Sequence, residues 1–424
     1  MTRSVSPSAV AGRVVAPPSK SAMQRAVACA AMARGVSTIR NPSPCADSIA
    51  ACRVAEALGA SVERRDDRVV VRGGLSAAGR ASPVVASCGE SGLCLRMFSA
   101  IAALLPVDVE LRAEGSLASR SVAMVADALE ALGARCSTSG GLPPVRLRGP
   151  LRPGRVRVDG SASSQFVTGL VMALPMAGGE STVSVERLAS GGYVELTMEV
   201  MRAFGAEAWR DGAEIRVAGT PYRAADYEVE GDWSGAAFML VAGAVAGRGA
   251  LEVVGLNPDS SQPDRAVVAA LEAAGAVVRR VPGGYRVGGS DLRGFEFDAT
   301  DCPDLFPPLV ALASRCRGTT RLTGASRLRG KESDRAAALS EEFGGLGLDI
   351  RVDGDEMTVI GPGPTGPGGG RPLAGAVSSR GDHRIAMAAA VAALAGSGPV
   401  AIGGAECVSK SWPGFFDALD SIRA

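Results

Sequence analysis

A repeat of about 70 residues constrains the fold of this 424-residue chain more than any other feature of its sequence. Five times, a helical stretch ends in a small-residue stop containing glycine, and a β-type stretch, a turn and a second β-type stretch follow. Successive glycines lie 70 to 74 residues apart. Glycine just past the last helical turn readily adopts the left-handed conformation that ends a helix. We predict five such helix ends, at Gly59, Gly133, Gly205, Gly275 and Gly347.

A second element recurs with the same period. A short strand leads into a turn rich in Gly, Ser, Pro and Asp, and an Ala-rich helix follows. Its six copies are Val14–Lys20, Val84–Glu90, Val156–Ala162, Tyr227–Asp232, Phe297–Pro303 and Val377–Asp382. The last unit ends in a helix over Gly414–Arg423 and lacks its own hairpin, whereas the strand-like stretch Ser4–Val15 precedes the first opening. We expect Ser4–Val15 to supply what the last unit lacks.

Six units and a returning N-terminal strand predict an α/β protein of two domains with three units each. One domain is expected to be continuous, over 15–225, and the other split, over 1–14 plus 226–424. The chain would cross between them near Ala16–Ser19 and near Gly219–Glu228. A flat solenoid of six units is the alternative that the repeat alone leaves open.

Composition excludes several classes of protein. The 45 Lys and Arg against 44 Asp and Glu give a net charge of +1, which argues against a nucleic-acid or membrane-surface binder. Nine cysteines without a C-x-x-C pair, beside one histidine, argue against a metal site and favour a reducing, cytoplasmic compartment. The N-terminus lacks the apolar segment of a signal peptide, and the weakly polar run Ile385–Ala395 is too short to span a membrane. With only 4% aromatic residues, the core is expected to consist of Ala, Val and Leu.

The turns that open the repeats carry polar and charged side chains at helix N-termini, where free N–H groups favour anions. Taken singly, each set has a structural explanation: a solvated surface pair, helix caps, a mixed-charge surface run or a buried histidine. Their recurrence at equivalent turns of a repeat favours a shared anion site. The residues are Lys20, Ser21, Arg25, Gly92, Arg96, Arg120, Ser163, Ser164, Gln165, Asp301, Asp304, Lys331–Arg335, Asp382, His383, Arg384 and Lys410.

These residues resemble the enolpyruvyl transferases, and the resemblance runs from about Val14 to Phe416. Its most specific parts are Ser19–Arg25, Ser163–Phe166, Lys331–Arg335 and Asp382–Met387. The resemblance implies an α/β (α+β) protein whose two domains each contain three βαβαββ units, with helices inside and sheets outside. It also implies an active site in the interdomain cleft, a monomer, and no cofactor or metal.

Within the family, the motifs match the branch that acts on shikimate 3-phosphate. Such enzymes transfer the enolpyruvyl group of phosphoenolpyruvate to the 5-hydroxyl of that substrate by addition and elimination, in chorismate and aromatic amino acid biosynthesis. The alternative is the sister enzyme that uses UDP-N-acetylglucosamine. It is disfavoured because Cys94 lies within a helix-like stretch and no loop cysteine precedes an Arg-Pro pair.

The resemblance implies a role for each site residue. Asp304, Glu332 and Lys20 are the expected catalytic residues, with Glu332 as proton donor and Asp304 as proton acceptor. The shikimate 3-phosphate residues implied are Lys20, Ser21, Arg25, Ser163, Ser164, Gln165, Ser190, Asp304 and Lys331. The phosphoenolpyruvate residues implied are Lys20, Gly92, Arg120, Gln165, Arg335, Arg384 and Lys410.

Three departures from the family pattern stand out. Glu90 and Ser91 stand where many members have Asn and Ala, Arg120 is followed by Ser121 instead of proline, and Arg327 stands where some members have a substrate-binding asparagine.

Two other classes of protein are alternatives to an enolpyruvyl transferase. A binding protein without turnover should have lost Asp304, Glu332 or Lys20, which are all present. An RNA 3′-phosphate cyclase needs a nucleophilic histidine and a basic surface, and the chain has one histidine and a net charge of +1.

Overall fold

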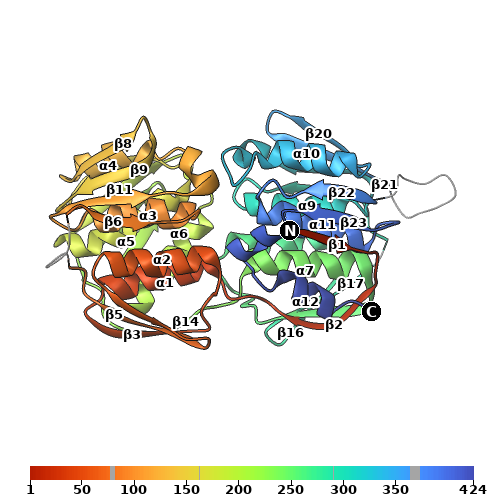
Figure 1. Cartoon of the computed structure of the whole chain (residues 1–424), viewed down its shortest axis with the longest axis horizontal. Coiled ribbons are helices and arrows are strands. Elements are labelled where there is room, and N and C mark those ends of the chain that lie inside the picture. The colour runs from red at the N-terminus through yellow and green to blue at the C-terminus, as the bar shows by residue number, and fades with distance from the viewer. Residues whose placement is uncertain (77–81, 162, 290, 363–372) are drawn as a thin grey trace. The chain divides into compact units, whose positions relative to one another are not determined.

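The computed structural model describes residues 1–76, 82–161, 163–289, 291–362 and 373–424 (Figure 1). The chain divides into two compact units. Met1–Pro17 and Gly231–Ala424 form one of them, the split unit, and Pro18–Glu230 forms the other, the continuous unit. The chain therefore passes from one unit to the other at Pro17–Pro18 and returns at Glu230–Gly231. Ala162, the last residue of the third repeat opening, lies outside the described residues.

The continuous unit contains three four-stranded sheets of the same design. In each, the first two strands are parallel, and an antiparallel hairpin completes the sheet. The strand orders are β14-β3-β5-β4, β6-β7-β9-β8 and β10-β11-β13-β12. The bounds are β3 Gly35–Arg40, β4 Ser61–Arg64, β5 Arg68–Gly73, β6 Val84–Ser87, β7 Asp108–Arg112, β8 Arg135–Ser139, β9 Leu142–Arg148, β10 Arg155–Asp159, β11 Ser181–Glu186, β12 Ala208–Asp211, β13 Glu214–Val217 and β14 Asp226–Glu228.

The split unit repeats this design, except that its last sheet has three strands among the described residues. The strand orders are β16-β17-β15-β2, β18-β19-β21-β20 and β1-β23-β22. The bounds are β1 Thr2–Val5, β2 Val10–Val15, β15 Gly247–Val254, β16 Val277–Val281, β17 Gly284–Gly288, β18 Glu296–Asp298, β19 Arg317–Thr323, β20 Asp349–Asp353, β21 Glu356–Pro362, β22 Gly375–Ser378 and β23 Val400–Gly403. The six sheets correspond to the six repeats of the sequence.

The N-terminal segment forms two strands with different partners. β1 pairs antiparallel with β23 and so completes the last repeat, which confirms the expectation for the start of Ser4–Val15, but the expectation is wrong for Val10–Val15. β2 instead pairs parallel with β15 in the fourth repeat, although helix α1 (Lys20–Met32) of the first repeat follows it. β14 does the reverse, because it pairs with β3 in the first repeat and precedes helix α7 (Trp233–Ala246) of the fourth. The expectation that Val14 and Tyr227 open the first and fourth sheets is therefore wrong, since these two strands exchange sheets.

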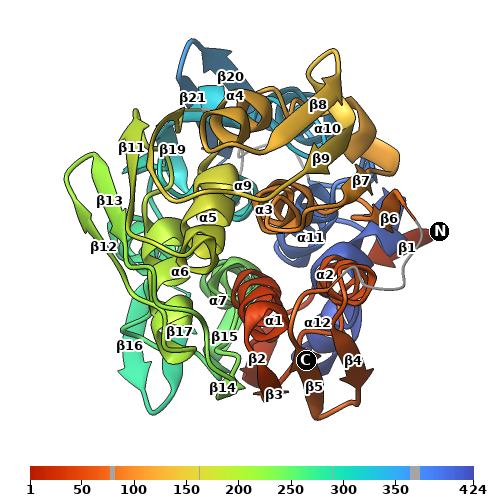
Figure 2. The same ribbon diagram turned by 90° about the vertical axis from the view of Figure 1, so that its left-hand side faces the viewer.

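The helices fall into two groups by burial. α1, α3 and α5 of the continuous unit, like α7, α9 and α11 of the split unit, are buried along nearly their whole length. In Figure 2, which faces the continuous unit, α1, α3 and α5 lie inside and the strands of the three sheets lie around them. The bounds are α1 Lys20–Met32, α2 Ala46–Ala57, α3 Gly92–Ala102, α4 Met124–Ala131, α5 Ser164–Ala173, α6 Gly192–Ala203, α7 Trp233–Ala246, α8 Val267–Ala273, α9 Phe306–Ala313, α10 Arg335–Gly345, α11 His383–Leu394 and α12 Phe415–Ser421. Short 3-10 helices are η1 Gly115–Ser119, η2 Leu174–Ala177, η3 Pro263–Ala266, η4 Pro303–Leu305, η5 Ala325–Leu328 and η6 Ala405–Lys410.

Small residues allow the inner helices to approach closely. A Cβ atom at Gly169 of α5 would lie 2.7 Å from the carbonyl oxygen of Met97 in α3, so alanine does not fit there without a shift of the backbone. Each unit has its own apolar core, in which Ala, Val and Leu predominate. The low aromatic content is therefore the composition that this close helix packing requires.

The predicted helix ends are confirmed. The glycines that follow α2, α4, α6, α8 and α10 all have positive φ angles, between 79° and 118°. A side chain at such a position is strained by the clash of its Cβ with the backbone, which explains why glycine recurs there. The five are Gly59, Gly133, Gly205, Gly275 and Gly347.

Candidate active site

The three inner helices of the continuous unit begin at capping serines. The side-chain oxygens of Ser19, Ser91 and Ser163 accept hydrogen bonds from backbone N–H groups in the first turns of α1, α3 and α5. These caps fix where each helix begins and leave the remaining N–H groups of the first turn directed outwards. The predicted site residues of this unit therefore stand at helix ends that attract anions.

Lys20 is the first residue of α1, and its ammonium group forms an ion pair. Nζ lies 3.0 Å from Oδ2 of Asp47 in the first turn of α2, and the two side chains are only 15% and 6% exposed. Because the pair is largely shielded from water, it holds Lys20 in place better than a surface pair would. Asp47 has no distinguishing sequence signal, since acidic residues are common in the first turn of a helix.

Arg25 lies within the continuous unit with a side chain that is 1% exposed. Its guanidinium donates to the hydroxyl oxygens of Thr197 and Thr168, at 2.9 and 3.3 Å. It also donates to the carbonyl oxygens of Ser21 and Tyr193, at 2.9 and 3.1 Å. All four acceptors are neutral, and no carboxylate of the described residues forms an ion pair with it. Burial lowers the pKa of Arg25 to about 10, because no nearby carboxylate offsets the cost of burying its charge. An anionic ligand would supply that counter-charge.

Gly92, the first residue of α3, lies directly against two arginine side chains. A Cβ atom at this position would be 2.8 Å from Nη1 of Arg96 and 3.1 Å from Nη1 of Arg120. Arg96 is held by Gln165 Oε1 at 2.9 Å and by the carbonyl oxygen of Ser121 at 2.7 Å. A side chain at this position would displace one or both guanidinium groups from the helix N-terminus.

The serines predicted to bind a phosphate lie at the starts of α5 and α6. Ser164 and Ser190 are buried, and Ser163 caps α5. Ser190 has a φ angle of 56°, in the left-handed region that non-glycine residues rarely adopt. Such strain costs about 1 to 3 kcal/mol and is concentrated at functional sites. Gln165 connects this group to Arg96 through the bond described above.

In the split unit, Arg335 binds three carboxylates at once. Its side chain is 1% exposed and lies at the start of α10. Nε lies 2.7 Å from Oδ2 of Asp382, Nη1 lies 2.7 Å from Oδ1 of Asp304, and Nη2 lies 2.5 Å from Oε2 of Glu332. Burial alone would lower the pKa of Arg335, but Asp382, Glu332 and Asp304 outweigh it and raise the pKa well above its ordinary value.

Asp304, in η4, is the carboxylate with the most cationic neighbours. Besides Arg335, it accepts from Nη2 of Arg384 at 2.9 Å and from Nζ of Lys331 at 3.5 Å. Burial alone would raise the pKa of Asp304, but Arg384, Lys331 and Arg335 hold it well below its ordinary value. Asp304 is therefore fully ionised near neutral pH and can accept a proton only as a weak base.

The segment Asp382–Arg384 fixes the start of α11. Oδ1 of Asp382 accepts from the backbone N–H of Arg384 at 3.0 Å, so the residue both caps the helix and binds Arg335. His383 is 1% exposed, with Nδ1 3.8 Å from Oδ1 of Asp382. Lys410 ends η6 and is 7% exposed.

The two units differ in how their cations are balanced. In the split unit Lys331, Arg335 and Arg384 contact three carboxylates, so this group is nearly neutral. In the continuous unit, Arg25 and Arg120 have no carboxylate partner among the described residues. Uncompensated positive charge is therefore found at Arg25 and Arg120 of the continuous unit, whereas Lys20 pairs with Asp47 and the cations of the split-unit group pair with its carboxylates.

The sequence gives no signal for Asp264, a fully buried carboxyl group in η3. The hydroxyl of Ser234 donates to its Oδ2. Burial raises the pKa of Asp264 to about 6, with a further rise from the charge of Asp304 and an opposing effect of Arg384. A single acidic residue after Gln262-Pro263 resembles an ordinary turn, so only the structure reveals its place beside the Asp304 group.

Asp264 is expected to make the protein less stable as pH rises. Because its pKa is raised on folding, the folded chain binds more protons than the unfolded chain between about pH 4 and 6, so stability falls across that window. Asp264→Asn should not show this fall in stability with pH. The free energy of unfolding of the variant, minus that of the unsubstituted protein, should therefore rise by about 1 to 3 kcal/mol from pH 4 to pH 8. Thermal unfolding at several pH values measures this. Asp259→Asn, an exposed change on the same loop, should leave the pH dependence unaltered, and an unaltered slope in Asp264→Asn would contradict the assignment.

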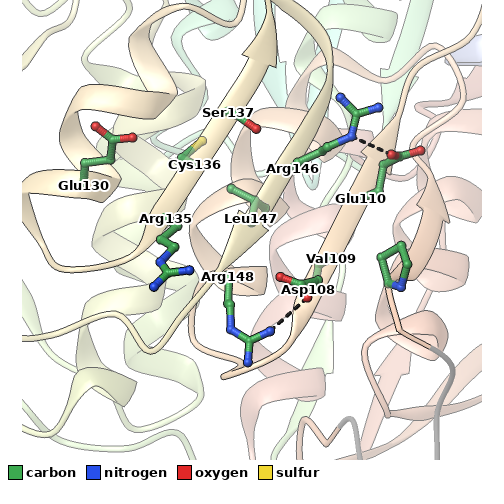
Figure 3. Close-up of a pocket in the computed structure, with 11 residues that line it drawn as sticks. Asp108, Val109, Glu110, Glu130, Arg135, Cys136, Ser137, Arg146, Leu147 and Arg148 are labelled. Carbon is green, nitrogen blue, oxygen red and sulfur yellow. Dashed lines mark hydrogen bonds and ion pairs between the residues drawn. The ribbon is translucent and has the colours of Figure 1, made fainter.

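A hollow on the second sheet of the continuous unit contains none of the predicted residues (Figure 3). Its charged side chains pair across the strands, Arg146 with Glu110 at 2.9 Å and Arg148 with Asp108 at 2.9 Å. Exposed pairs of this kind contribute about 0 to 1 kcal/mol each and leave few groups for a ligand. The hollow is therefore a feature of the sheet surface and not the candidate site.

No group of three or more His, Cys, Asp and Glu among the described residues is arranged to hold a metal ion. No helix in the described ranges is both long and apolar enough to cross a membrane. Cys94 is fully buried in α3, and burial raises its pKa well above the ordinary value, as is typical of a structural and not of a reactive thiol.

Comparisons with known proteins agree over nearly the whole chain. The family model described as EPSP synthase (3-phosphoshikimate 1-carboxyvinyltransferase) matches residues 5–419. The 3-phosphoshikimate 1-carboxyvinyltransferase of Aeropyrum pernix is 40% identical over 422 residues, which cover 99% of this chain and 95% of that protein. The enzyme of the same name from Methanocorpusculum labreanum is 37% identical over 424 residues, covering 99% and 98%.

Solved structures confirm the predicted fold. EPSP synthase from Acinetobacter baumannii superposes with a TM-score of 0.81 at 28% identity, covering 100% of this chain and 98% of that one. The enolpyruvyl transferase NikO from Streptomyces tendae, at 18% identity and a TM-score of 0.78 over 99% and 96% of the chains, shares the fold. The enolpyruvyl transferase fold that the resemblance implied is thus present. With a family match over residues 5–419 and relatives of this similarity, the chain belongs to the EPSP synthase family, the 3-phosphoshikimate 1-carboxyvinyltransferases.

Proposed function

We propose that this protein transfers the enolpyruvyl group of phosphoenolpyruvate to the 5-hydroxyl of shikimate 3-phosphate and releases phosphate. The observation that carries the proposal is the family match over residues 5–419. The product, 5-enolpyruvylshikimate 3-phosphate, serves chorismate and aromatic amino acid biosynthesis. The protein is proposed to act in the cytoplasm as a monomer, without a cofactor.

The continuous unit supplies most of the groups for shikimate 3-phosphate. Arg25, with Ser21, is assigned to the substrate carboxylate, because its buried charge has only neutral partners and an anion would compensate it. Ser163, Ser164 and Ser190 are assigned to the phosphate, whose oxygens accept from hydroxyls and from the N-terminal N–H groups of α5. Lys20 and Gln165 are assigned to both substrates.

Phosphoenolpyruvate is assigned to residues of both units. Gly92 offers the backbone of the α3 N-terminus, and Arg120 lies beside it. Arg335, Arg384 and Lys410 of the split unit complete the set. Arginine suits the planar carboxylate and the phosphate because its N–H groups donate in pairs.

Asp304 and Glu332 are assigned to the proton transfers, with Lys331 beside Asp304. Glu332 protonates the methylene carbon of phosphoenolpyruvate, and Asp304 accepts the proton of the 5-hydroxyl as its oxygen bonds to C2. Cleavage of the bond between C2 and the phosphate oxygen then expels phosphate, and the Glu332 carboxylate takes a proton back from the methyl group, which restores the double bond. Phosphoenolpyruvate would draw Arg335 and Arg384 away from Asp304, which makes Asp304 a stronger base when it is needed.

Glu332 must hold a proton to act as an acid, yet Arg335 lies 2.5 Å from its carboxylate. We infer that the charges of the two bound substrates offset the cations and allow Glu332 to take up this proton. Activity should then fall as pH rises through the pKa of Glu332, and the fall should occur at higher pH in the kcat profile than in the kcat/KM profile. Rate measurements against pH test this, and Glu332→Gln, which cannot donate the proton, should lose most of the activity at every pH. Coincident profiles would contradict the inference.

A phosphate-release assay tests the function itself. The protein with phosphoenolpyruvate and shikimate 3-phosphate should release phosphate, whereas omission of either should not. UDP-N-acetylglucosamine, the acceptor of the sister enzyme, should not replace shikimate 3-phosphate. Release with the sugar nucleotide alone would overturn the proposal in favour of that enzyme.

A further inference from the structure

Arg120 lacks the side-chain partners that hold the other arginines of the site. Its Nε is buried without a hydrogen-bond partner, and no carboxylate of the described residues pairs with its guanidinium. Its neighbour Arg96 is held by Gln165 and by the carbonyl of Ser121. The place of Arg120 beside Gly92 must therefore depend on the backbone that precedes it, which is η1.

Glu90 joins η1 to the turn that carries Gly92. Its Oε2 accepts from the backbone N–H of Ser116 at 3.3 Å and from the hydroxyl of Ser116 at 3.0 Å. The two segments are also linked through the backbone, since Glu114 N–H donates to the carbonyl oxygen of Gly89 at 2.8 Å. The backbone bond holds Glu114, the residue before η1, whereas the Glu90 carboxylate binds Ser116 within η1.

The contact between Glu90 and η1 is close enough to restrict the residue at 115. A Cβ atom on Gly115 would lie 2.5 Å from the carboxyl carbon of Glu90, and Gly115 has a φ angle of 50°. The backbone conformation favours glycine here, and a larger residue would also displace the Glu90 carboxylate from η1. From Ser116 the chain continues through η1, and Arg120 N–H donates to the carbonyl oxygen of Leu117 at 3.1 Å.

We propose that Glu90 is a positioning residue that holds η1, and with it the Arg120 guanidinium, against the N-terminus of α3. The carboxylate is suited to this because one oxygen accepts both donors of Ser116. The inference rests on the proposed function for its kinetic consequence, since Arg120 is assigned there to phosphoenolpyruvate. The geometric part, that Glu90 orders residues 115–120, does not depend on it.

The kinetic test compares Glu90→Ala with Glu114→Ala. Glu114 is a matched control because it is another exposed carboxylate next to η1 that bonds to the hydroxyl of Ser87 and not to Ser116. Glu90→Ala should raise KM for phosphoenolpyruvate about tenfold, the factor that 1.4 kcal/mol of lost positioning corresponds to, and change KM for shikimate 3-phosphate less than twofold. Glu114→Ala should change both less than twofold. Equal effects of the two variants, or equal effects on both substrates, would overturn the proposal.

A double-mutant cycle and hydrogen exchange separate positioning from loss of folding. Ser116→Ala should produce part of the effect, because it removes the hydroxyl bond and keeps the backbone bond, and adding it to Glu90→Ala should produce little more, because Glu90→Ala already removes both. Backbone hydrogen exchange should be faster over residues 115–120 in Glu90→Ala than in Glu114→Ala. This measurement needs no turnover, so it distinguishes failure of the positioning from failure of the proposed function. Unchanged exchange in Glu90→Ala would overturn the proposal even if the enzyme is active.

Discussion

Replacing Asp304 by Asn will lower kcat by about 10²- to 10⁴-fold, the usual contribution of a positioned general base. Asn has nearly the shape of Asp, and its one carbonyl oxygen can still accept from Arg335 or from Arg384, but it cannot take the proton of the 5-hydroxyl. Loss should therefore appear mainly in kcat, because the substrate charges still meet the same cations. Steady-state phosphate release with both substrates varied measures it.

Asp301→Asn is the matched control for this change. Asp301 is an exposed carboxylate three residues before Asp304, and its substitution removes the same charge from the same turn. It should alter kcat less than twofold. If Asp304→Asn retained kcat within tenfold of the unsubstituted protein while remaining folded by circular dichroism, Asp304 would not be the proton acceptor.

Arg335→Met will destabilise the protein by about 3 to 5 kcal/mol, as expected when one partner of a buried ion network is removed. The substitution leaves Asp304, Asp382 and Glu332 without the guanidinium that all three contact. Methionine fills much of the space but offers no donor, so three carboxylates remain close together with less positive charge. Urea denaturation of the two proteins compared at one pH measures the difference.

The pH dependence of this loss follows from the carboxylates. The pKa of Asp304 is depressed in the folded protein, so its contribution to stability is present above its unfolded value of about 4 and is lost as pH falls towards the folded value. The gap between Arg335→Met and the unsubstituted protein should therefore narrow below pH 4. Arg380→Met removes an arginine that binds two carboxylates at the surface of the same unit and should cost only about 0 to 1 kcal/mol. Equal losses for the two variants would contradict the ion network.

The local pattern of the chain was predictable because it repeats. The five glycines at helix ends have the positive φ angles that their position requires, and the N-terminal strand β1 completes the last sheet. The partners of β2 and β14 were not predictable. Both strands pair with segments more than 180 residues away, and a short apolar alternation fits the edge of any of the six sheets equally well.

In the candidate site, too, the types of residue were predictable from the sequence, but the partners of their side chains were not. The sequence motifs indicate which side chains belong together, but not that Asp304 and Asp382 neutralise the cations of the split unit. The burial of Arg25 among threonines and the raised pKa of Asp264 depend on neighbours that are distant in sequence. Such contacts arise from packing and carry no local signal. The departure at Glu90 was visible in the sequence, and its bonds to Ser116 give it a structural explanation.

The most direct test of enolpyruvyl transfer by addition and elimination is turnover in D₂O, with the products analysed by mass spectrometry. If Glu332 protonates the methylene carbon, the intermediate has a methyl group carrying one deuterium, and loss of any of its three hydrogens leaves deuterium in part of the product. The account predicts one phosphate released per 5-enolpyruvylshikimate 3-phosphate formed and deuterium in its enolpyruvyl methylene. Release of phosphate without this product, or a product free of deuterium, would contradict it.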